Sequence, residues 1–250
     1  MNRLKFSIAK FVVSASGYAG LGAAIALTTS LVACGGGGSD GSQVTAVPVK
    51  QAITYAYTNG LQKTLNVTGT ANSGSTSMPI TGTLTFTLGK ASSTTFNGVP
   101  ALQSTATVTG SMSVNGQTAP FNSSATNYLT ATYDPIGSSD STSYCVSSTT
   151  TGYPTSSSVG QTGNIGSSTC YTNSSKTVRV GTETVSYVTS AGSLANSLDV
   201  KVISNIYMTS NQFSASGATT YTVSSAGLPS LTRWEMVGTM NGVTISIVGQ

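Results

Sequence analysis

The chain of 250 residues contains no histidine and only six acidic residues. Without histidine, neither a Ser-His-Asp nor a Cys-His arrangement can form, and histidine ligation of a metal is excluded. The acidic residues show no recognisable paired spacing; they are Asp40, Asp134, Asp140, Glu183, Asp199 and Glu235. We therefore expect no catalytic residue, no metal site and no cofactor, although two distant carboxylates could still meet in the fold as a glycosidase pair.

One long apolar run lies near the N-terminus. Three basic residues, Arg3, Lys5 and Lys10, precede an apolar stretch from Phe11 to about Ala33. This is the layout of a bacterial secretion signal. Roughly 20 such residues would also suffice to cross a bilayer. However, the stretch contains several serine, threonine and glycine residues and no basic cluster follows it, which disfavours a permanent membrane span.

The apolar stretch ends in Leu31-Val32-Ala33-Cys34. This tetrapeptide resembles the lipobox of bacterial lipoproteins. The resemblance implies that residues 1–33 are a signal peptide and that Cys34 carries fatty acyl chains such as palmitate and becomes the first mature residue. By the same resemblance, Gly35 in place of aspartate favours the outer membrane of the cell envelope. The alternative is an ordinary signal peptide followed by an incidental cysteine.

Removal of residues 1–33 changes the charge balance. The whole chain has ten basic residues, and three of them lie in the removed segment, so seven basic residues remain against six acidic ones. Binding to nucleic acid requires a basic surface. We therefore expect no nucleic-acid partner, and we interpret the basic excess as a targeting feature.

Residues 34–50 are predicted to form a flexible tether behind the lipidated Cys34. The segment begins with four glycines at 35–38 and continues through Ser39, Asp40, Gly41 and Ser42. Such a composition buries too little apolar surface to become ordered. Its root-mean-square reach is on the order of 20 Å, which would hold a small domain just off the lipid headgroups.

Residues 51–250 are predicted to form a single all-β domain. Apolar and hydroxyl side chains alternate, which places them on opposite faces of antiparallel strands with one buried face. The alternating apolar sets are Ile53, Tyr55 and Tyr57; Leu65 and Val67; Leu84, Phe86 and Leu88; Ala106, Val108, Met112 and Val114; Leu129, Ala131 and Tyr133; Val200, Val202, Ile206 and Met208; and Val243, Ile245 and Ile247. No window outside the signal shows a clear helical period.

Four Asn-Gly pairs support this interpretation, because both residues tolerate the positive φ of tight hairpin turns. The flanking strands favour hairpins most strongly at Asn115-Gly116 and Asn241-Gly242. We expect about ten strands in an antiparallel meander. The pattern leaves a sandwich, a barrel and a curved half-barrel open as the final shape.

The alternation disappears between about 138 and 175, where the sequence is rich in serine, threonine and glycine. We expect a long loop there, either functional or mobile. With Cys34 committed to lipid, Cys145 and Cys170 remain, and in an oxidising compartment they are predicted to form a disulfide. Tyr144, Tyr153 and Tyr171 are expected to pack over it, and Trp234 to pack in the core.

Three hypotheses about function follow. The first is a non-catalytic envelope lipoprotein that displays a β domain for structural purposes or for interaction with an envelope protein. The second is a carrier that holds a lipid or another apolar ligand in a curved sheet, as in periplasmic lipoprotein-handling proteins, which resemble the expected architecture. The third, a hydrolase built on unpaired carboxylates, is residual.

Overall fold

The computed structural model describes residues 46–250 except 241, and the described part of the chain consists of one helix and thirteen strands. The elements are α2 (Val49–Asn59), β1 (Leu61–Ser73), β2 (Thr76–Leu88), β3 (Ser92–Phe96), β4 (Val99–Val114), β5 (Gln117–Leu129), β6 (Pro135–Ser139), β7 (Tyr144–Thr150), β8 (Thr162–Tyr171), β9 (Arg179–Ala191), β10 (Ser197–Met208), β11 (Phe213–Ser224), β12 (Pro229–Met240) and β13 (Val243–Gly249). The expected all-β, antiparallel architecture is confirmed, with more strands than the ten expected.

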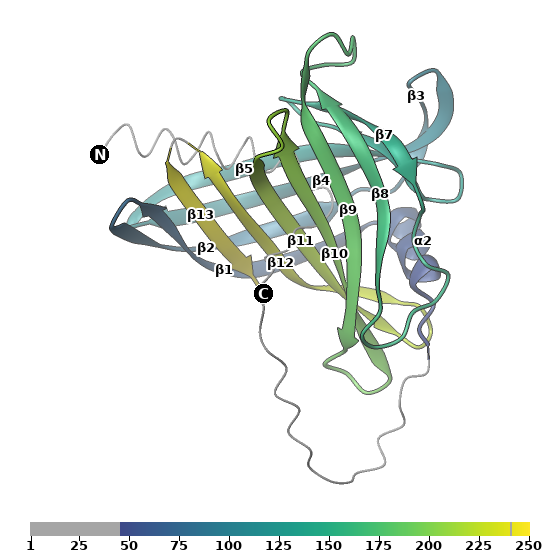
Figure 1. The fold of residues 1–250 in the computed structure, drawn as a ribbon. Coiled ribbons are helices and arrows are strands. Elements are labelled where there is room, and N and C mark those ends of the chain that lie inside the picture. The colour runs from purple at the N-terminus through teal and green to yellow at the C-terminus, as the bar shows by residue number, and fades with distance from the viewer. Residues whose placement is uncertain (1–45, 241) are drawn as a thin grey trace.

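All thirteen strands belong to a single curved sheet, and chain neighbours pair antiparallel through most of it (Figure 1). Two pairings connect parts of the chain that are distant in sequence: β1 with β13, and β2 with β4. Together these pairings close the order of strands on itself, so that β1 and β2 have no open edge where they are paired on both sides. The described residues therefore form one sheet rather than a sandwich of two.

β3 lies outside this closed order and extends the path of β2 along β4. Between β2 and β3 the chain stays attached to β4. The Gly89 N–H donates to the Thr105 carbonyl oxygen at 2.8 Å, and the Ser104 hydroxyl donates to the Gly89 carbonyl oxygen at 2.5 Å. A turn at Asn97 and Gly98, both with positive φ, then leads into β4. β2, β3 and β4 thus form one long hairpin.

Alternation along the strands divides the sheet into an inner and an outer face. The inner face of β1, β2, β4, β12 and β13 is apolar and buried; it includes Leu65, Val67, Ile80, Leu84, Phe86, Val108, Met112, Trp234, Met236, Ile245 and Ile247. The outer face carries hydroxyl pairs such as Thr64–Thr85 at 3.0 Å and Thr239–Thr244 at 2.9 Å. Burial of the inner face supplies the main driving force for folding.

Glycines allow the long strands to bend tightly over this core. A Cβ added at Gly82 would run into the backbone of Ser111 and Met112, and one at Gly69 into the backbone of Ser246 and Ile247. Both glycines lie on the inner face, because Gly82 pairs with Val67 and Gly69 pairs with Ile80. Glycine within a strand commonly marks such a close approach of two backbones.

Helix α2 corrects one of our predictions, because Ile53, Tyr55 and Tyr57 were expected to lie in a strand. The buried positions are Val49, Ala52, Ile53, Ala56 and Tyr57, which is the spacing of one helical face. The two alanines complete that face, whereas Tyr55 is exposed. The helix ends at Asn59, and the Gly60 N–H donates to the Ala56 carbonyl oxygen at 2.8 Å. Asn59-Gly60 therefore ends a helix rather than turning a hairpin.

Three other boundaries also differ from the prediction. The tether was expected to reach residue 50, yet Val47 forms a bridge with Ser157 and α2 starts at Val49. Strand β5 stops at Leu129, so Ala131 and Tyr133 lie in the following turn. The expected loop at 138–175 contains all of β7 and β8.

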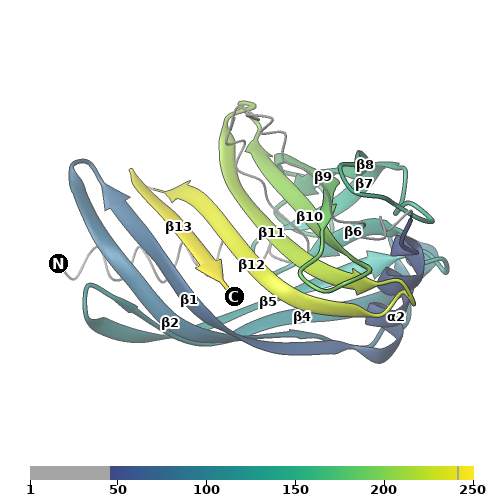
Figure 2. The same cartoon turned by 90° about the horizontal axis from the view of Figure 1, so that it is seen from below.

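Helix α2 packs against one end of the sheet, where β1 begins and β11 ends (Figure 2). The Ala91 N–H donates to the Tyr57 carbonyl oxygen at 2.7 Å, and the Gln51 side chain donates to the Ala226 carbonyl oxygen at 3.3 Å. Lys50 forms an ion pair with Asp134 in the turn before β6. These contacts fix the helix across this end of the sheet.

Candidate functional site

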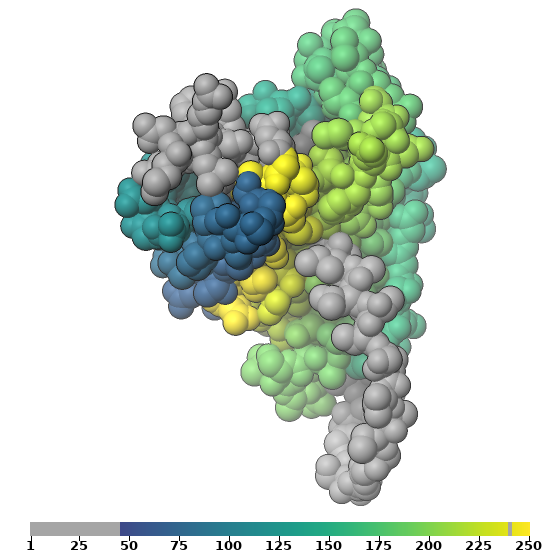
Figure 3. All heavy atoms as spheres, turned by 60° about the vertical axis from the view of Figure 1, so that its left-hand side comes forward, coloured from purple at the N-terminus to yellow at the C-terminus, as the bar shows by residue number. Residues whose placement is uncertain are grey.

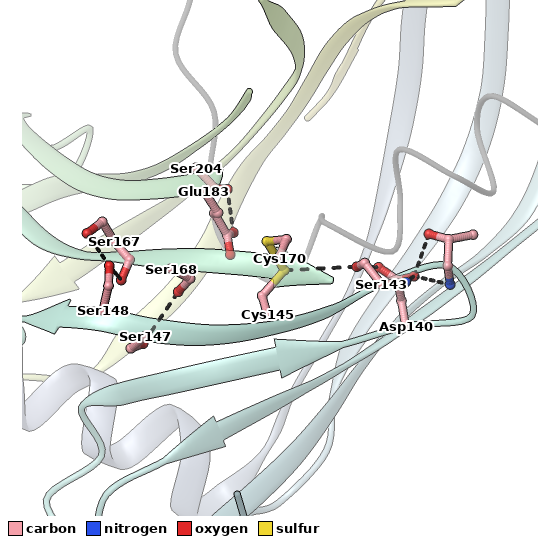
Figure 4. The surroundings of a disulfide bond; sticks show 11 residues. Asp140, Ser143, Cys145, Ser147, Ser148, Ser167, Ser168, Cys170, Glu183 and Ser204 are labelled. Atoms are coloured by element: carbon pink, nitrogen blue, oxygen red, sulfur yellow. Dashed lines mark hydrogen bonds between the residues drawn. A yellow bond between two sulfur atoms is a disulfide. The ribbon is translucent and has the colours of Figure 1, made fainter. Parts of the chain in front are cut away.

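The region around Cys145 and Cys170 is the candidate functional site, because it gathers buried polar groups on the inner face. The two cysteines are directly paired residues of β7 and β8 and form a disulfide (Figure 4). Both are buried. The predicted pairing is therefore present in the structure, as a link between adjacent strands.

Hydroxyl groups tie β7 to β8 beyond the disulfide. Ser148 and Ser167 lie 3.0 Å apart, and the Thr149 and Ser167 hydroxyls lie 2.7 Å apart. Cross-strand pairs of this kind contribute a few tenths of a kcal/mol to about 1 kcal/mol each. They explain why a sequence with few apolar residues still forms strands here, contrary to the expected loop.

Glu183 of β9 lies on the same inner face, opposite Ser168 of β8 and Ile206 of β10. Only 7 % of it is exposed, and its carboxylate accepts a hydrogen bond from the Ser204 hydroxyl at 2.6 Å. Burial raises the pKa of Glu183 to about 7; the Ser204 hydrogen bond lowers it, and the negative charge of Asp140 raises it further. Desolvation therefore keeps a substantial fraction of this carboxyl group protonated near neutral pH.

Asp140 organises the turn between β6 and β7. Its carboxylate accepts from the Ser143 N–H at 2.9 Å and from the Ser143 hydroxyl at 2.9 Å (Figure 4). The Ser143 hydroxyl oxygen in turn lies 4.0 Å from the sulfur of Cys145. Asp140 therefore acts on Glu183 through its charge, while its hydrogen bonds serve the turn.

Ligand-type atoms of Cys145, Cys170 and Glu183 lie within 4.8 Å of one another. Cysteine binds a metal ion as the free thiolate, and both sulfurs here are joined in the disulfide. In the oxidised protein this group therefore offers only one carboxylate. The chemistry that the arrangement supports is proton binding by Glu183.

The other described carboxylates each have a partner of their own. Asp134 pairs with Lys50 and accepts from the Tyr153 N–H at 3.2 Å. Glu235 pairs with Lys201 and with Arg233. Asp199 accepts from the Thr222 hydroxyl at 2.5 Å. None of these contacts brings two carboxylates together as a glycosidase pair would require.

The aromatic residues match our expectation only in part. Trp234 is buried in the core, as predicted. Tyr144 packs against Phe96, with ring centroids 5.1 Å apart. Tyr153 lies beside Lys50, whose ammonium is 5.9 Å from the ring centroid. Tyr153 therefore belongs to the α2 end of the sheet and not to a cover over the disulfide.

The expected lipidation site, Cys34, and the signal peptide at 1–33 lie outside the described residues, as does the tether up to residue 45. Within the described part of the chain, no helix has the length and apolar character needed to cross a membrane. Comparison with family models, with curated proteins and with solved structures finds no match for this chain.

Sequence reasoning recorded Glu183 among the acidic residues but did not place it in a site. Its position in the alternation of β9 could have indicated burial. Glu183 lies on the same face as Val185 and Tyr187. The other face carries Thr182, Thr184 and Ser186. A charged residue in phase with apolar ones indicates a buried carboxylate.

Proposed function

We propose that this protein is a non-catalytic lipoprotein of the bacterial cell envelope, anchored through acylated Cys34, whose β domain serves a structural or interaction role. The observation that carries the proposal is the buried inner face. Leu65, Leu84, Trp234, Ile245 and Ile247 are each at most 2 % exposed. A carrier would need an apolar surface that a ligand can reach. The domain instead uses its apolar residues to hold the closed sheet together.

The outer face supports the same proposal. It presents hydroxyl pairs such as Thr105–Thr126, and charges of both signs meet in the local cluster of Lys201, Arg233 and Glu235. Such a surface is well hydrated and carries no strong field of either sign. An envelope protein is the partner class that this proposal implies, and nucleic acid is not.

Anchoring is tested with the full chain expressed in a bacterial host that processes lipoproteins. The intact mass of the membrane-extracted protein should equal that of residues 34–250 plus acyl chains. The Cys34→Ser variant should lack the acyl mass. It should not be recovered from the membrane fraction as a mature protein. A wild-type mass that corresponds to cleavage without acylation would contradict the anchor.

The display role is tested separately on the same acylated protein. Organic extraction after purification should yield no stoichiometric lipid beyond the covalent chains, and an apolar fluorescent dye should not bind. Crosslinking in cells should give a defined adduct with an envelope protein. Reproducible recovery of one equivalent of free lipid would instead favour the carrier hypothesis.

A further inference from the structure

The point at which the tether joins the domain determines which end of the sheet faces the anchor. Val47 is held by two hydrogen bonds to Ser157, at 2.8 and 2.9 Å, and α2 follows from Val49. Twelve residues, 35–46, separate Cys34 from this junction. Fully extended they span at most about 40 Å, and as a flexible chain they span on the order of 20 Å. The α2 end of the sheet is therefore the end near Cys34.

Three turns surround this junction (Figure 1). The turn at 225–228 touches the start of α2, because Gly227 lies beside Pro48 and Gln51. The turn at 192–196 is its neighbour, since Ser197 pairs with Ser224 where β10 begins and β11 ends. The segment at 157–161 carries Ser157, the partner of Val47, and is tied to the end of β9 by hydrogen bonds to Thr189.

Each of these turns exposes one large apolar side chain. Val159 is 53 % exposed, Leu194 is 66 % exposed and Leu228 is 51 % exposed. None of the three turns contains a charged residue. The turn with Leu194 protrudes furthest at this end of the molecule (Figures 1 and 3). Exposed apolar side chains on uncharged, protruding turns are suited to the interfacial region of a bilayer.

The opposite end of the sheet provides a comparison. It also exposes apolar residues: Val178 lies between Lys176 and Arg179, whereas Met208 and Phe213 flank an uncharged turn. Distance from the tether, rather than composition, therefore distinguishes the two ends. Strands of about 13 residues separate the two ends, which is on the order of 40 Å at about 3.3 Å per residue. That distance keeps the opposite end away from a surface to which Cys34 is fixed.

We propose that the turns bearing Val159, Leu194 and Leu228 form a membrane-docking surface that rests in the headgroup region of the bilayer holding the acylated Cys34. This inference rests on the proposed acylation of Cys34. The anchor keeps the domain close to the bilayer, and the three side chains then fix its orientation, with the α2 end toward the lipid and the hairpin between β10 and β11 directed away.

The test uses tryptophan fluorescence of the acylated full chain reconstituted in phosphatidylcholine vesicles with brominated acyl chains. Trp234 is buried and is the only native tryptophan, so it gives a constant background. The indole introduced by Leu194→Trp should be quenched by at least half relative to vesicles without bromine. The indole introduced by Phe213→Trp, at the opposite end, is the matched control and should lose less than a tenth of its emission.

Equal, weak quenching of both variants on vesicle-bound, acylated protein would overturn the docking surface and leave the anchor intact. A blue-shifted but unquenched emission from Leu194→Trp would also overturn it, since it would indicate a protein partner or a second copy at this surface. Val159→Trp provides a second position if Leu194→Trp does not fold. Failure of the proposed function itself is recognised earlier, as an intact mass without acyl chains.

Discussion

At the scale of single residues, Glu183 is an acidic side chain buried in the inner face. It occupies a position in phase with Val185 and receives one hydrogen bond, from Ser204. An ionised carboxylate with so few partners is costly to bury, whereas a protonated one is tolerated. With a pKa of about 7, the carboxyl group beside the disulfide is protonated in mildly acidic solution and becomes charged as the pH rises through neutrality.

A pH dependence of stability follows from this proton. Because the pKa of Glu183 is raised from 4.5 to about 7 by folding, the folded state binds more protons than the unfolded state between these values. The free energy of unfolding should thus fall as pH rises from 4.5 to 7, by up to about 3 kcal/mol. Denaturant unfolding at several pH values measures this slope.

The variant Glu183→Gln should lose that slope, because the amide does not titrate. Glu235→Gln, which removes an acidic residue from the outer face, is the control and should keep it. An unchanged slope in Glu183→Gln would show that other groups cause the pH dependence.

Close backbone contact gives a second prediction for a single residue. Gly82→Ala places a Cβ against the Ser111 carbonyl oxygen, and the backbone must shift to accept it. We expect a loss of about 1–3 kcal/mol in the free energy of unfolding, as for other overpacked sites. Gly89→Ala is the control, because its Cβ would lie 3.2 Å from the nearest atom, the Thr105 carbonyl oxygen. Similar losses in both variants would contradict the close-approach argument.

At the scale of elements, the disulfide stabilises a hairpin that has few apolar residues. Cys145 and Cys170 are 25 residues apart in the sequence. The chain-entropy model gives about 3.5 kcal/mol for a loop of this length. Cys145→Ala combined with Cys170→Ala should therefore lower the free energy of unfolding by about 3 kcal/mol in denaturant titrations, and reduction of the wild type should reproduce the loss. A stability independent of reductant would rule out a stabilising disulfide.

The elements also show how far the sequence could be interpreted. Alternation correctly indicated the strands that contain Leu84, Val108, Val202 and Ile245, because each alternates apolar side chains on the inner face with more polar ones on the outer face. It failed for α2, where alanines are two of the five buried residues, and for β7 and β8, where hydroxyl pairs replace apolar contacts. The periodicity of apolar residues along the sequence indicates which elements bury apolar side chains. Elements held together by small or polar side chains are therefore not recognised from it.

At the scale of the whole molecule, closure of the sheet depends on contacts that no local pattern indicates. The pairing of Val67 with Gly249 joins the first strand to the last, and that of Leu84 with Gly110 joins β2 to β4. Likewise, Glu183 meets the disulfide only because β7, β8 and β9 are neighbours in one sheet. The sequence predicted the disulfide from the cysteine count, but not the buried carboxyl beside it.

Strand β13 is the element through which closure can be tested, because it pairs with β12 on one side and β1 on the other. Ile247 faces the core and is 1 % exposed, whereas the adjacent Ser246 faces outward. Ile247→Asp should cost at least about 3 kcal/mol, since an unpaired charge would enter the apolar interior. Ser246→Asp should change stability by less than about 0.5 kcal/mol.

Loss of β13 pairing would also leave β1 and β12 with free edges, and free edges favour association between chains. Ile247→Asp should therefore both lower the denaturation midpoint and produce oligomers in size-exclusion chromatography, while Ser246→Asp remains like the wild type. If Ile247→Asp were destabilised yet strictly monomeric, the edges of β1 and β12 would have to be protected by other means. If both variants were equally stable, the inward orientation of Ile247, and with it the closed order of strands, would be wrong.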